Sequence, residues 1–599
     1  MHAKKRGQPL ASKIHKLALV IAYPFYYVLS LPFYIKRQIL PFVLLSSRDA
    51  EEVTVFGLPR GGSGLDYWGC YAKRVRSTGV FGLDTRQYLG VPYGVHVWPF
   101  TLFVFSRLRF NQFFLLCAGM IALAVIWLTP SVGVWQLWWL PLVFLSTFLL
   151  FNISAATWEL LAWGCGLLGL SAFHNGHCAL SGTLYGLALL AHPGVFFCNS
   201  IIAALLLLPG AEIKQILSAG ISGTLIAGWF LIPYFRSRDK LGREESINIE
   251  KSRSFANSEL WLMAAWTLFS GTLAASSQLP LSQILLLLFP LVVIIVNCKW
   301  KMIFSFYTVL NLMAVTGAIS LAFHPELPAI IAYLYVINTS PRMVFPDYIV
   351  SGFKSPLPLH PVFRQHERRA FLREMMEAVP DMKQNRIALQ GESEYFDRYL
   401  TASLTSMLVT GGYTLVNGFY AEIGDSKIKK NFSDVFSEHS SIDAMQKACI
   451  FGGCSHIVAF TKSFSNHLSA NGFCLVRTIH SVHLSHINDE QRDVYVHATG
   501  CPTVFAIGGD FANIGEQSPL EAMEQGRFSV FGKPESECTV MLSCYKGWRA
   551  VCKGRNVPIC DDGPGLKFVF PDSADEYTEV EFSYSYLNYF RISGGCDAG

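Results

Sequence analysis

Long apolar runs dominate the first 349 residues of the chain. Each is about 20 residues long, which is enough for a helix to cross a bilayer core of roughly 30 Å. The run Leu180–Leu208 is too long for one straight span, and Pro193 predicts a kink within it. Leu327–Ile337 is shorter and is expected to be interfacial or re-entrant. The nine predicted spans are Leu17–Ile35, Asn111–Leu128, Val134–Phe151, Ala155–Phe173, Leu180–Leu208, Ile216–Tyr234, Leu260–Ser276, Leu281–Val296 and Ile303–Ala322.

The remaining residues have a different pattern. Short helical and extended segments alternate at first, among them the amphipathic His366–Ala378 and the strand Arg386–Gln390. From about Asp493 the pattern becomes strand and turn, as in Arg527–Phe531 and Trp548–Cys552. We therefore expect an α-helical polytopic membrane domain in residues 1–349, with a long first outside loop at 36–97. An α/β subdomain at 350–490 and a β-sandwich-like subdomain at 491–599 should follow it.

Composition supports this division. The chain of 599 residues is 51% hydrophobic and 15% charged, whereas about 25% of residues are charged in an average soluble protein. Residues 1–349 hold 25 Lys+Arg and 14 Asp+Glu, a net charge of +11, and the remaining 23 and 29 give −6. A basic apolar half and an acidic polar half exclude a disordered chain, a coiled coil and an ordinary cytosolic enzyme.

Basic residues in short loops predict the orientation of the spans. Five Lys/Arg in the first 16 residues, six in Arg236–Arg253 and two in Lys299–Lys301 should all be cytoplasmic. Nine spans satisfy this and put residues 350–599 outside the cytoplasm, whereas a tenth span at Leu327–Ile337 would conflict with the rule. The N-terminal run lacks a small-residue cleavage site and is expected to stay attached as the first span.

The first outside loop carries the best candidate for chemistry. Asp66 follows a glycine-rich turn, and a helix-like segment after it carries Lys73, Arg74 and Arg76. A carboxylate beside a basic cluster suits group transfer from a phosphate-bearing lipid. The carboxylate would accept a proton from an incoming hydroxyl, and the cations would stabilise the leaving phosphate. The alternative is that Asp66 caps a helix and pairs with an arginine.

Several motifs resemble those of one family. The loop pattern from Gly64 to Gly94 and the Leu-Ala-His-Pro segment ending at Pro193 resemble GT-C-fold membrane glycosyltransferases, closest to the YfhO-like proteins of bacteria. The tail adds a Tyr-x-Gly-Trp segment ending at Trp548, a Gly-x-x-Val-Pro segment ending at Pro558 and a Val-x-Phe-x-Tyr strand ending at Tyr584. The resemblance implies a bacterial inner-membrane protein that uses a polyprenyl-phosphate-linked sugar as its donor.

The same resemblance implies roles for individual residues. Asp66 is the best match to the catalytic base of the first outside loop, and Asp84 is the second. Arg342 either holds a lipid phosphate or snorkels to the interface. The predicted phosphate-binding residues are Lys73, Arg74, Arg76, Arg86 and Arg342, and the predicted substrate-binding residues are Trp68, Tyr93, His96, Glu159, His174, His177 and His192.

Glu159 and the histidines each allow a second interpretation. Glu159 is the only acid inside a predicted span, and ionisable groups in a membrane are functional candidates by default; the alternative is a position near the lipid headgroups. His174 and His177 have the spacing of a metal pair, but a metal site needs three or four ligands. No further ligand is obvious, so we favour polar packing or substrate contact over a metal, and the sequence gives no support for a divalent cation as cofactor.

The polar half shows no nucleotide-binding or hydrolase motif. It is therefore expected to bind an acceptor or another protein, and carbohydrate recognition through exposed aromatic residues is plausible. Nine of the 15 cysteines lie at or beyond Cys449. Some would pair in an oxidising compartment, but the pattern does not give the pairing.

Three functions remain open. The first is a glycosyltransferase that uses a lipid-linked sugar. The second is a non-catalytic GT-C-like subunit that scaffolds other membrane proteins, because fold does not fix function. The third, a transporter, ranks last because internal repeats and charged mid-membrane elements other than Glu159 are not seen. The expected partners are membrane lipids, a lipid-linked sugar and proteins of a membrane complex, but not nucleic acid.

Overall fold

The chain folds into two compact units. The helical unit comprises Met1–Arg48, Phe110–Gly223 and Glu250–Pro358, and the polar unit comprises Asp49–Arg109, Thr224–Ile249 and Leu359–Gly599. These units cut the chain differently from the predicted domains, because most of the first outside loop belongs with the polar half. The computed structural model describes residues 73–86, 89–92, 99–108, 110–129, 137–144, 157–207, 210–237, 254–299, 306–344, 365–381, 384–391, 405, 407–417, 435–480, 493–501, 505–511, 519–542, 544–560 and 565–590.

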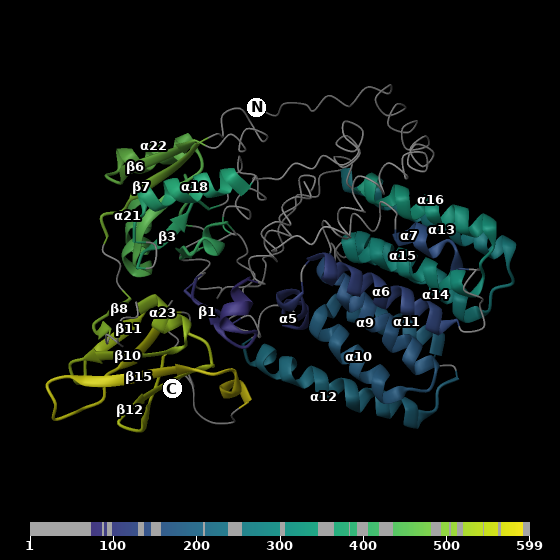
Figure 1. Cartoon of the computed structure of the whole chain (residues 1–599), viewed down its shortest axis with the longest axis horizontal. Helices are drawn as coiled ribbons and strands as arrows, with labels where there is room; N and C mark the ends of the chain where they lie inside the picture. The colour runs from purple at the N-terminus through teal and green to yellow at the C-terminus, as the bar shows by residue number, and fades with distance from the viewer. Residues whose placement is uncertain are drawn as a thin grey trace. The chain divides into compact units, whose positions relative to one another are not determined.

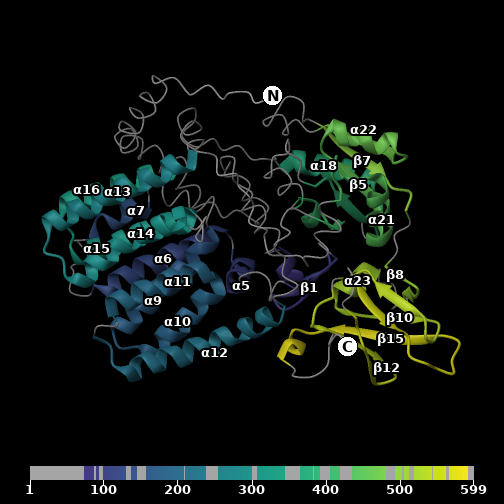
Figure 2. The same ribbon diagram turned by 180° about the vertical axis from the view of Figure 1, so that it is seen from behind.

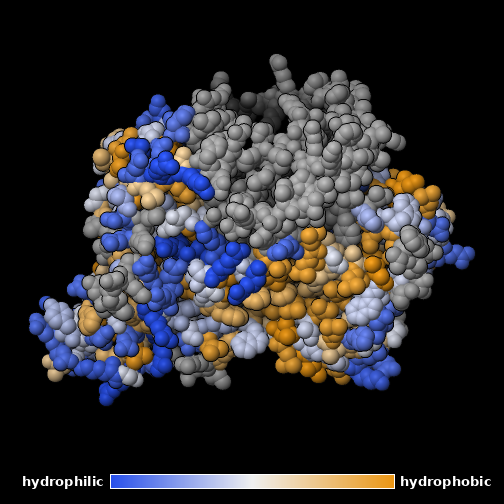
Figure 3. Space-filling view, viewed as in Figure 1, coloured by the Kyte–Doolittle hydropathy of each residue, from blue (hydrophilic) through white to orange (hydrophobic). Residues whose placement is uncertain are grey.

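Apolar helices build the helical unit, and α6, α9, α10 and α11 lie side by side in it (Figures 1 and 2). Hydrophobic residues gather on the surface of these helices (Figure 3), as expected for segments solvated by lipid. The predicted span Leu17–Ile35 lies outside the described residues. The helices are α6 (Phe110–Leu128), α7 (Leu140–Phe144), α9 (Thr157–His174), α10 (Cys178–Ala191), α11 (Pro193–Leu207), α12 (Ile213–Ser237), α13 (Ser254–Ser276), α14 (Leu281–Lys299), α15 (Phe306–Phe323) and α16 (Leu327–Val344).

The segment predicted as one kinked span is a helical hairpin. Tyr185 of α10 and Asn199 of α11 would be about 21 Å apart along one continuous helix. Instead, the Tyr185 hydroxyl donates to the Asn199 carbonyl oxygen at 3.4 Å, so the chain folds back at His192. Pro193 therefore begins a new helix, where its missing N–H is not needed, and the prediction of a single kinked span is wrong.

The segment predicted as short, Leu327–Ile337, lies in a longer helix, α16, of 18 residues. Its apolar part is Leu327–Ser340, and its interfacial location stays a prediction. Asn338 and Thr339 continue it because their side chains donate to carbonyl oxygens one turn earlier, at 2.7 Å each. The Tyr333 hydroxyl donates to the Ala314 carbonyl oxygen at 2.6 Å, which packs α16 against α15.

These two corrections change the expected topology. The end of α12 contacts the C-terminal residues, since Arg236 Nη1 donates to the Tyr589 carbonyl oxygen at 2.5 Å and the Tyr586 hydroxyl donates to the Trp229 carbonyl oxygen at 2.6 Å. The predictions that Arg236–Arg253 is cytoplasmic and that residues 350–599 are extracytoplasmic cannot both hold. Counting α10 and α11 as separate passes moves the end of α12 to the outside. Counting α16 as a further pass keeps residues 350–599 there.

The number of spans stays a prediction. Within the described ranges, one helix, Ile213–Arg236, is long and apolar enough to cross a membrane by length and composition, and the other apolar stretches are shorter.

A close contact holds α12 against α10. A Cβ added at Gly182 of α10 would lie 2.0 Å from the Ala219 carbonyl oxygen, so only glycine fits there.

The α/β part of the polar unit is a five-stranded sheet in the order β4-β3-β5-β7-β6. The first three strands are parallel, and β7 and β6 are antiparallel to their neighbours. Its strand β7 lies beyond the predicted subdomain boundary at 490. The elements are α18 (Gln365–Ala378), β3 (Arg386–Leu389), β4 (Thr414–Leu415), α21 (Ile442–Gly452), β5 (Cys454–Ala459), α22 (Lys462–Ala470), β6 (Cys474–His480) and β7 (Asp493–Ala498).

The C-terminal part is β-rich, as predicted. Antiparallel sheets in the orders β13-β12-β15-β10-β9 and β14-β11-β8 share one core, and the rings of Phe568 and Phe582 join them with centroids 5.1 Å apart. The elements are β8 (Ala506–Ile507), β9 (Asp510–Phe511), α23 (Pro519–Glu524), β10 (Arg527–Gly532), β11 (Glu537–Val540), β12 (Trp548–Cys552), β13 (Arg555–Val557), β14 (Leu566–Val569), β15 (Thr578–Tyr584) and the 3₁₀-helix η7 (Tyr586–Phe590).

Arg386 ties the two parts of the polar unit together. Its side chain is fully buried, and Nη2 donates to the Met541 carbonyl oxygen at 2.9 Å. The guanidinium also lies over the Phe505 ring, 5.0 Å from its centroid. Burial lowers the pKa of Arg386 to about 10, so the side chain remains cationic at neutral pH. The α/β sheet and the β-rich part are thus joined through one buried cation.

Candidate functional site

The described part of the first outside loop is folded onto the polar unit. Residues 73–78 are helical, and β1 (Leu83–Asp84) pairs with β2 (Val91–Pro92) in an antiparallel hairpin. Leu83 is buried in the core of the β-rich part. The helix α5 (Pro99–Arg107) follows. The candidate base Asp66 lies outside the described residues, as do Trp68, Tyr93 and His96.

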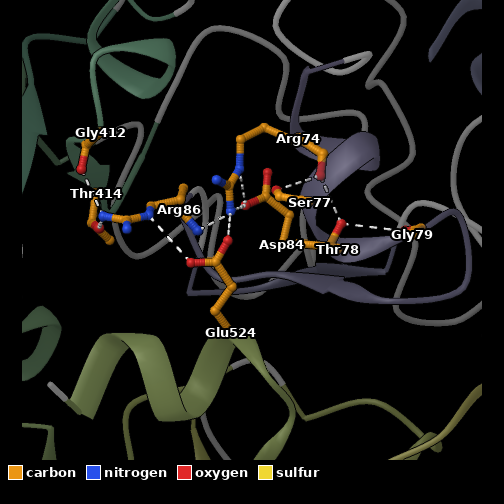
Figure 4. Close-up of polar contacts among 9 residues, drawn as sticks. All are labelled: Arg74, Ser77, Thr78, Gly79, Asp84, Arg86, Gly412, Thr414 and Glu524. Atoms are coloured by element: carbon orange, nitrogen blue, oxygen red, sulfur yellow. Dashed lines mark hydrogen bonds and ion pairs between the residues drawn. The ribbon is translucent and has the colours of Figure 1, made fainter. Parts of the chain in front are cut away.

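A cluster of two arginines and two carboxylates holds this loop in place (Figure 4). Arg74 Nε donates to Asp84 Oδ1 at 2.9 Å, and Arg74 Nη2 also bonds Glu524 of α23. Arg86 lies 3.6 Å from Glu524, measured from Nε to Oε2, and its backbone N–H donates to Asp84 Oδ1 at 3.0 Å. We call these four residues the ion cluster.

The ion cluster also reaches the α/β part of the polar unit. Arg86 Nη1 donates to the Gly412 carbonyl oxygen at 2.6 Å and to Thr414 Oγ1 at 3.1 Å. The Leu415 N–H donates to the Arg86 carbonyl oxygen at 2.8 Å. The loop is therefore fixed to β4 on one side and to α23 on the other.

The charges within the ion cluster balance. Asp84 is fully buried, and the Arg74, Arg86 and Glu524 side chains are at most one-fifth exposed. Burial lowers the pKa of Arg86, and the Glu524 carboxylate opposes that shift. Buried pairs of this kind hold a fold only while both partners are present. Arg74 and Arg86 thus have a structural role, and Asp84 is enclosed by its partners.

Lys73 and Arg76 are placed differently. Both lie on the helical residues 73–78 and are exposed. Lys73 Nζ donates to the Thr410 carbonyl oxygen at 3.0 Å, and Arg76 Nε donates to the Ser106 carbonyl oxygen at 2.5 Å. Lys73 and Arg76 are therefore more exposed than Arg74 and Arg86, the paired cations of the predicted phosphate-binding set.

Glu159 forms a second polar site, inside the helical unit. It is 1% exposed and accepts hydrogen bonds from Thr308 Oγ1 and Asn311 Nδ2 of α15, both at 2.8 Å. These residues lie near the N-terminal ends of α9 and α15, so both helices enter the unit from the same side.

The predicted histidines are not brought together as ligands. His174 and His177 are exposed at the turn between α9 and α10, whereas His192 Nδ1 accepts from the Val195 N–H at 3.2 Å and caps α11. Arg342 lies in α16. Across the described ranges, no group of three or more His, Cys, Asp or Glu residues is arranged to hold a metal ion.

Three site residues were not predicted from the sequence. Thr308 and Asn311 had a usable signal, because two polar residues three positions apart in an apolar run share one helix face. Glu524 had none. It lies 450 residues from Arg74 on a short helix of ordinary polar composition.

No protein-family model and no curated protein matches the chain. Among solved structures, it is similar to the arabinofuranosyltransferase AftD from mycobacteria, determined by single-particle cryo-EM, with 10% identity and a TM-score of 0.43 over 86% of this chain and 55% of that one. A mutant of AftD gives 10% identity and a TM-score of 0.42, over 86% and 57%. The chain thus spans little more than half the length of AftD. The resemblance to YfhO-like proteins stays a prediction.

Proposed function

We propose that this protein is an integral membrane glycosyltransferase that moves a sugar from a polyprenyl-phosphate donor to an acceptor outside the cytoplasm. The observation that supports it is that residues 73–86 of the first outside loop are anchored to β4 and α23 through the ion cluster. Asp66 lies seven residues before Lys73, so its Cα is within about 25 Å of the anchored segment. A catalytic group on a loop needs this kind of support, because small misplacements reduce the rate.

The chemistry would divide among the loop residues as follows. Asp66 accepts the proton of the acceptor hydroxyl as its oxygen bonds the anomeric carbon. The bond between that carbon and the donor phosphate oxygen breaks, and the phosphate leaves with the bonding electrons. Lys73 and Arg76, whose side chains are exposed, neutralise the developing charge. Arg74 and Arg86 hold the loop and do not bind the donor.

Glu159 is proposed to bind a hydroxyl of the lipid-linked sugar. It lies with Thr308 and Asn311 near the N-terminal ends of α9 and α15. A buried carboxylate held by a hydroxyl and an amide is able to exchange one of these partners for a sugar hydroxyl. His174 and His177 stay predicted substrate contacts.

A non-catalytic scaffold is the second candidate, and the ion cluster favours it. Two of the predicted phosphate-binding cations, Arg74 and Arg86, are already paired with carboxylates. A loop that serves only to join the two parts of the polar unit would have this arrangement. A scaffold would need no function from Asp66.

Substitution of Asp66 distinguishes the two candidates. Purified full-length protein in lipid nanodiscs would receive radiolabelled polyprenyl-phosphate sugars and a membrane extract as the acceptor source, with release of polyprenyl phosphate as the readout. We expect Asp66→Asn to abolish release while the thermal unfolding midpoint stays at the wild-type value. Glu52→Gln, in the same loop, is the matched control and should keep the activity. Equal release by Asp66→Asn and the control would contradict the proposal.

A further inference from the structure

Apolar side chains from three distant segments meet on the surface of the polar unit. The Phe81 ring packs against the Tyr586 ring in a tilted arrangement, with centroids 4.5 Å apart. Trp229 of α12 packs edge-on against Phe590, with centroids 5.3 Å apart. The Tyr586 hydroxyl donates to the Trp229 carbonyl oxygen at 2.6 Å. The loop, the end of α12 and η7 are therefore fixed to one another.

Large parts of this surface are exposed. Five side chains from the three segments are each between 43% and 61% accessible to solvent. Scattered exposed apolar residues are normal, but exposed apolar residues on segments that contact one another indicate an interaction surface. We call it the aromatic patch, and its members are Phe81, Trp229, Ile232, Phe235 and Leu587.

The helix that carries the patch indicates what covers it. Ile213–Arg236 is 24 residues long and apolar enough to cross a membrane, which is a length of about 36 Å against a hydrocarbon core of roughly 30 Å. Its last turns therefore extend into the headgroup region. Trp and Tyr are enriched at this level because one part of each side chain is apolar and another is polar.

Positive charge follows directly in the sequence. Arg236, Arg238, Lys240 and Arg243 come at and after the end of α12. Basic residues beside the end of a span are attracted to anionic headgroups. The aromatic patch would thus contact the lipid acyl chains, and the cations that follow it in the sequence would contact the lipid phosphates.

We propose that the aromatic patch is inserted into the lipid interface, so that the polar unit is held at the membrane surface by Phe81 and Leu587 in addition to α12. The loop residues around Phe81 and the 3₁₀-helix η7 then lie at the depth of the lipid phosphates. This inference needs α12 to span the membrane, but it does not need Asp66 to be catalytic.

Photo-crosslinking to lipid tests the proposal. A benzophenone amino acid would replace Phe81 or Leu587, one at a time, in full-length protein reconstituted with fluorescent phosphatidylcholine and phosphatidylglycerol. Val569 and Tyr577 are matched controls, being 54% and 52% exposed, and Tyr577 is separated from η7 by the length of β15, about 23 Å. We expect at least fivefold more lipid adduct at Phe81 and Leu587 than at the controls.

Two labelling results would contradict the proposal. Equal lipid labelling at all four positions, or adducts to another protein in native membranes in place of lipid, would overturn the proposal. A second measurement uses the tryptophan itself, with the fluorescence of Trp229 taken as wild type minus Trp229→Phe. Lipids brominated near the headgroup should quench it at least twofold more than lipids brominated near the chain ends. Absence of quenching by either lipid would also overturn the proposal.

Discussion

Two buried carboxylates, one in each unit, are stabilised in different ways. Asp84 in the polar unit accepts hydrogen bonds from the Arg74 guanidinium and the Arg86 N–H. Glu159 in the helical unit accepts from a hydroxyl and an amide. Arg74 carries a charge opposite to that of Asp84, whereas Thr308 and Asn311 are uncharged partners of Glu159. The pairing of Asp84 with arginine stabilises the fold of the polar unit. Burying Glu159 among apolar helices costs free energy, and such residues are usually retained because they have a function.

The predicted side of the membrane on which the polar unit lies is tested first. We expect an epitope inserted after Glu245 to be accessible from the same side as an epitope after Gly599, because the end of α12 bonds residues of η7. Accessibility would be measured by protease protection of right-side-out and inverted vesicles, with an N-terminal epitope as the opposite-side control. Protection of the first epitope where the second is cleaved would restore the nine-span prediction.

The next test removes the charge from Asp84. Asp84→Asn leaves two arginines and one carboxylate, Glu524, in the ion cluster, a net charge of +1, and loss of one partner of a buried pair costs roughly 3–5 kcal/mol. We expect the free energy of unfolding of the polar unit to fall by about this amount, measured by urea-dependent pulse proteolysis of the full-length protein. Asp575, which pairs with Lys553 on the surface, gives the control Asp575→Asn, for which no measurable change is expected. Equal stability of the two variants would show that the ion cluster does not hold the loop.

The elements of both units could largely be predicted from the sequence. Apolar runs predicted α6, α9, α14 and α15 to within three residues, because these helices are apolar along their whole length. The turn between α10 and α11 at His192 was not predicted, because the apolar run continues through it without a polar segment. The His-Pro pair at that turn was its only signal.

The site was predictable in part. Arg74, Asp84 and Arg86 could be named as candidates because glycines and charges of both signs are concentrated in one loop. Their pairing with one another and with Glu524 could not, because nothing in the local pattern links residues 450 positions apart. Sequence analysis therefore found the charged residues of the loop, but not that Arg74 and Arg86 pair with the carboxylates Asp84 and Glu524 of the chain itself.

The smallest expected effect concerns Glu159 and decides whether its burial serves a function. Glu159→Gln keeps the size of the side chain and offers Thr308 an acceptor, so the fold should persist with an unchanged thermal midpoint. A hydrogen bond to a charged group is worth about 1.5–3 kcal/mol, so sugar transfer should fall about 10- to 100-fold if Glu159 binds substrate. Thr316→Val is the matched control, because Thr316 is buried in α15 and bonds a carbonyl of its own helix; it should retain activity. A Glu159→Gln variant with full transfer, or one that unfolds while Thr316→Val does not, would place Glu159 with Asp84 among the carboxylates that only support the fold.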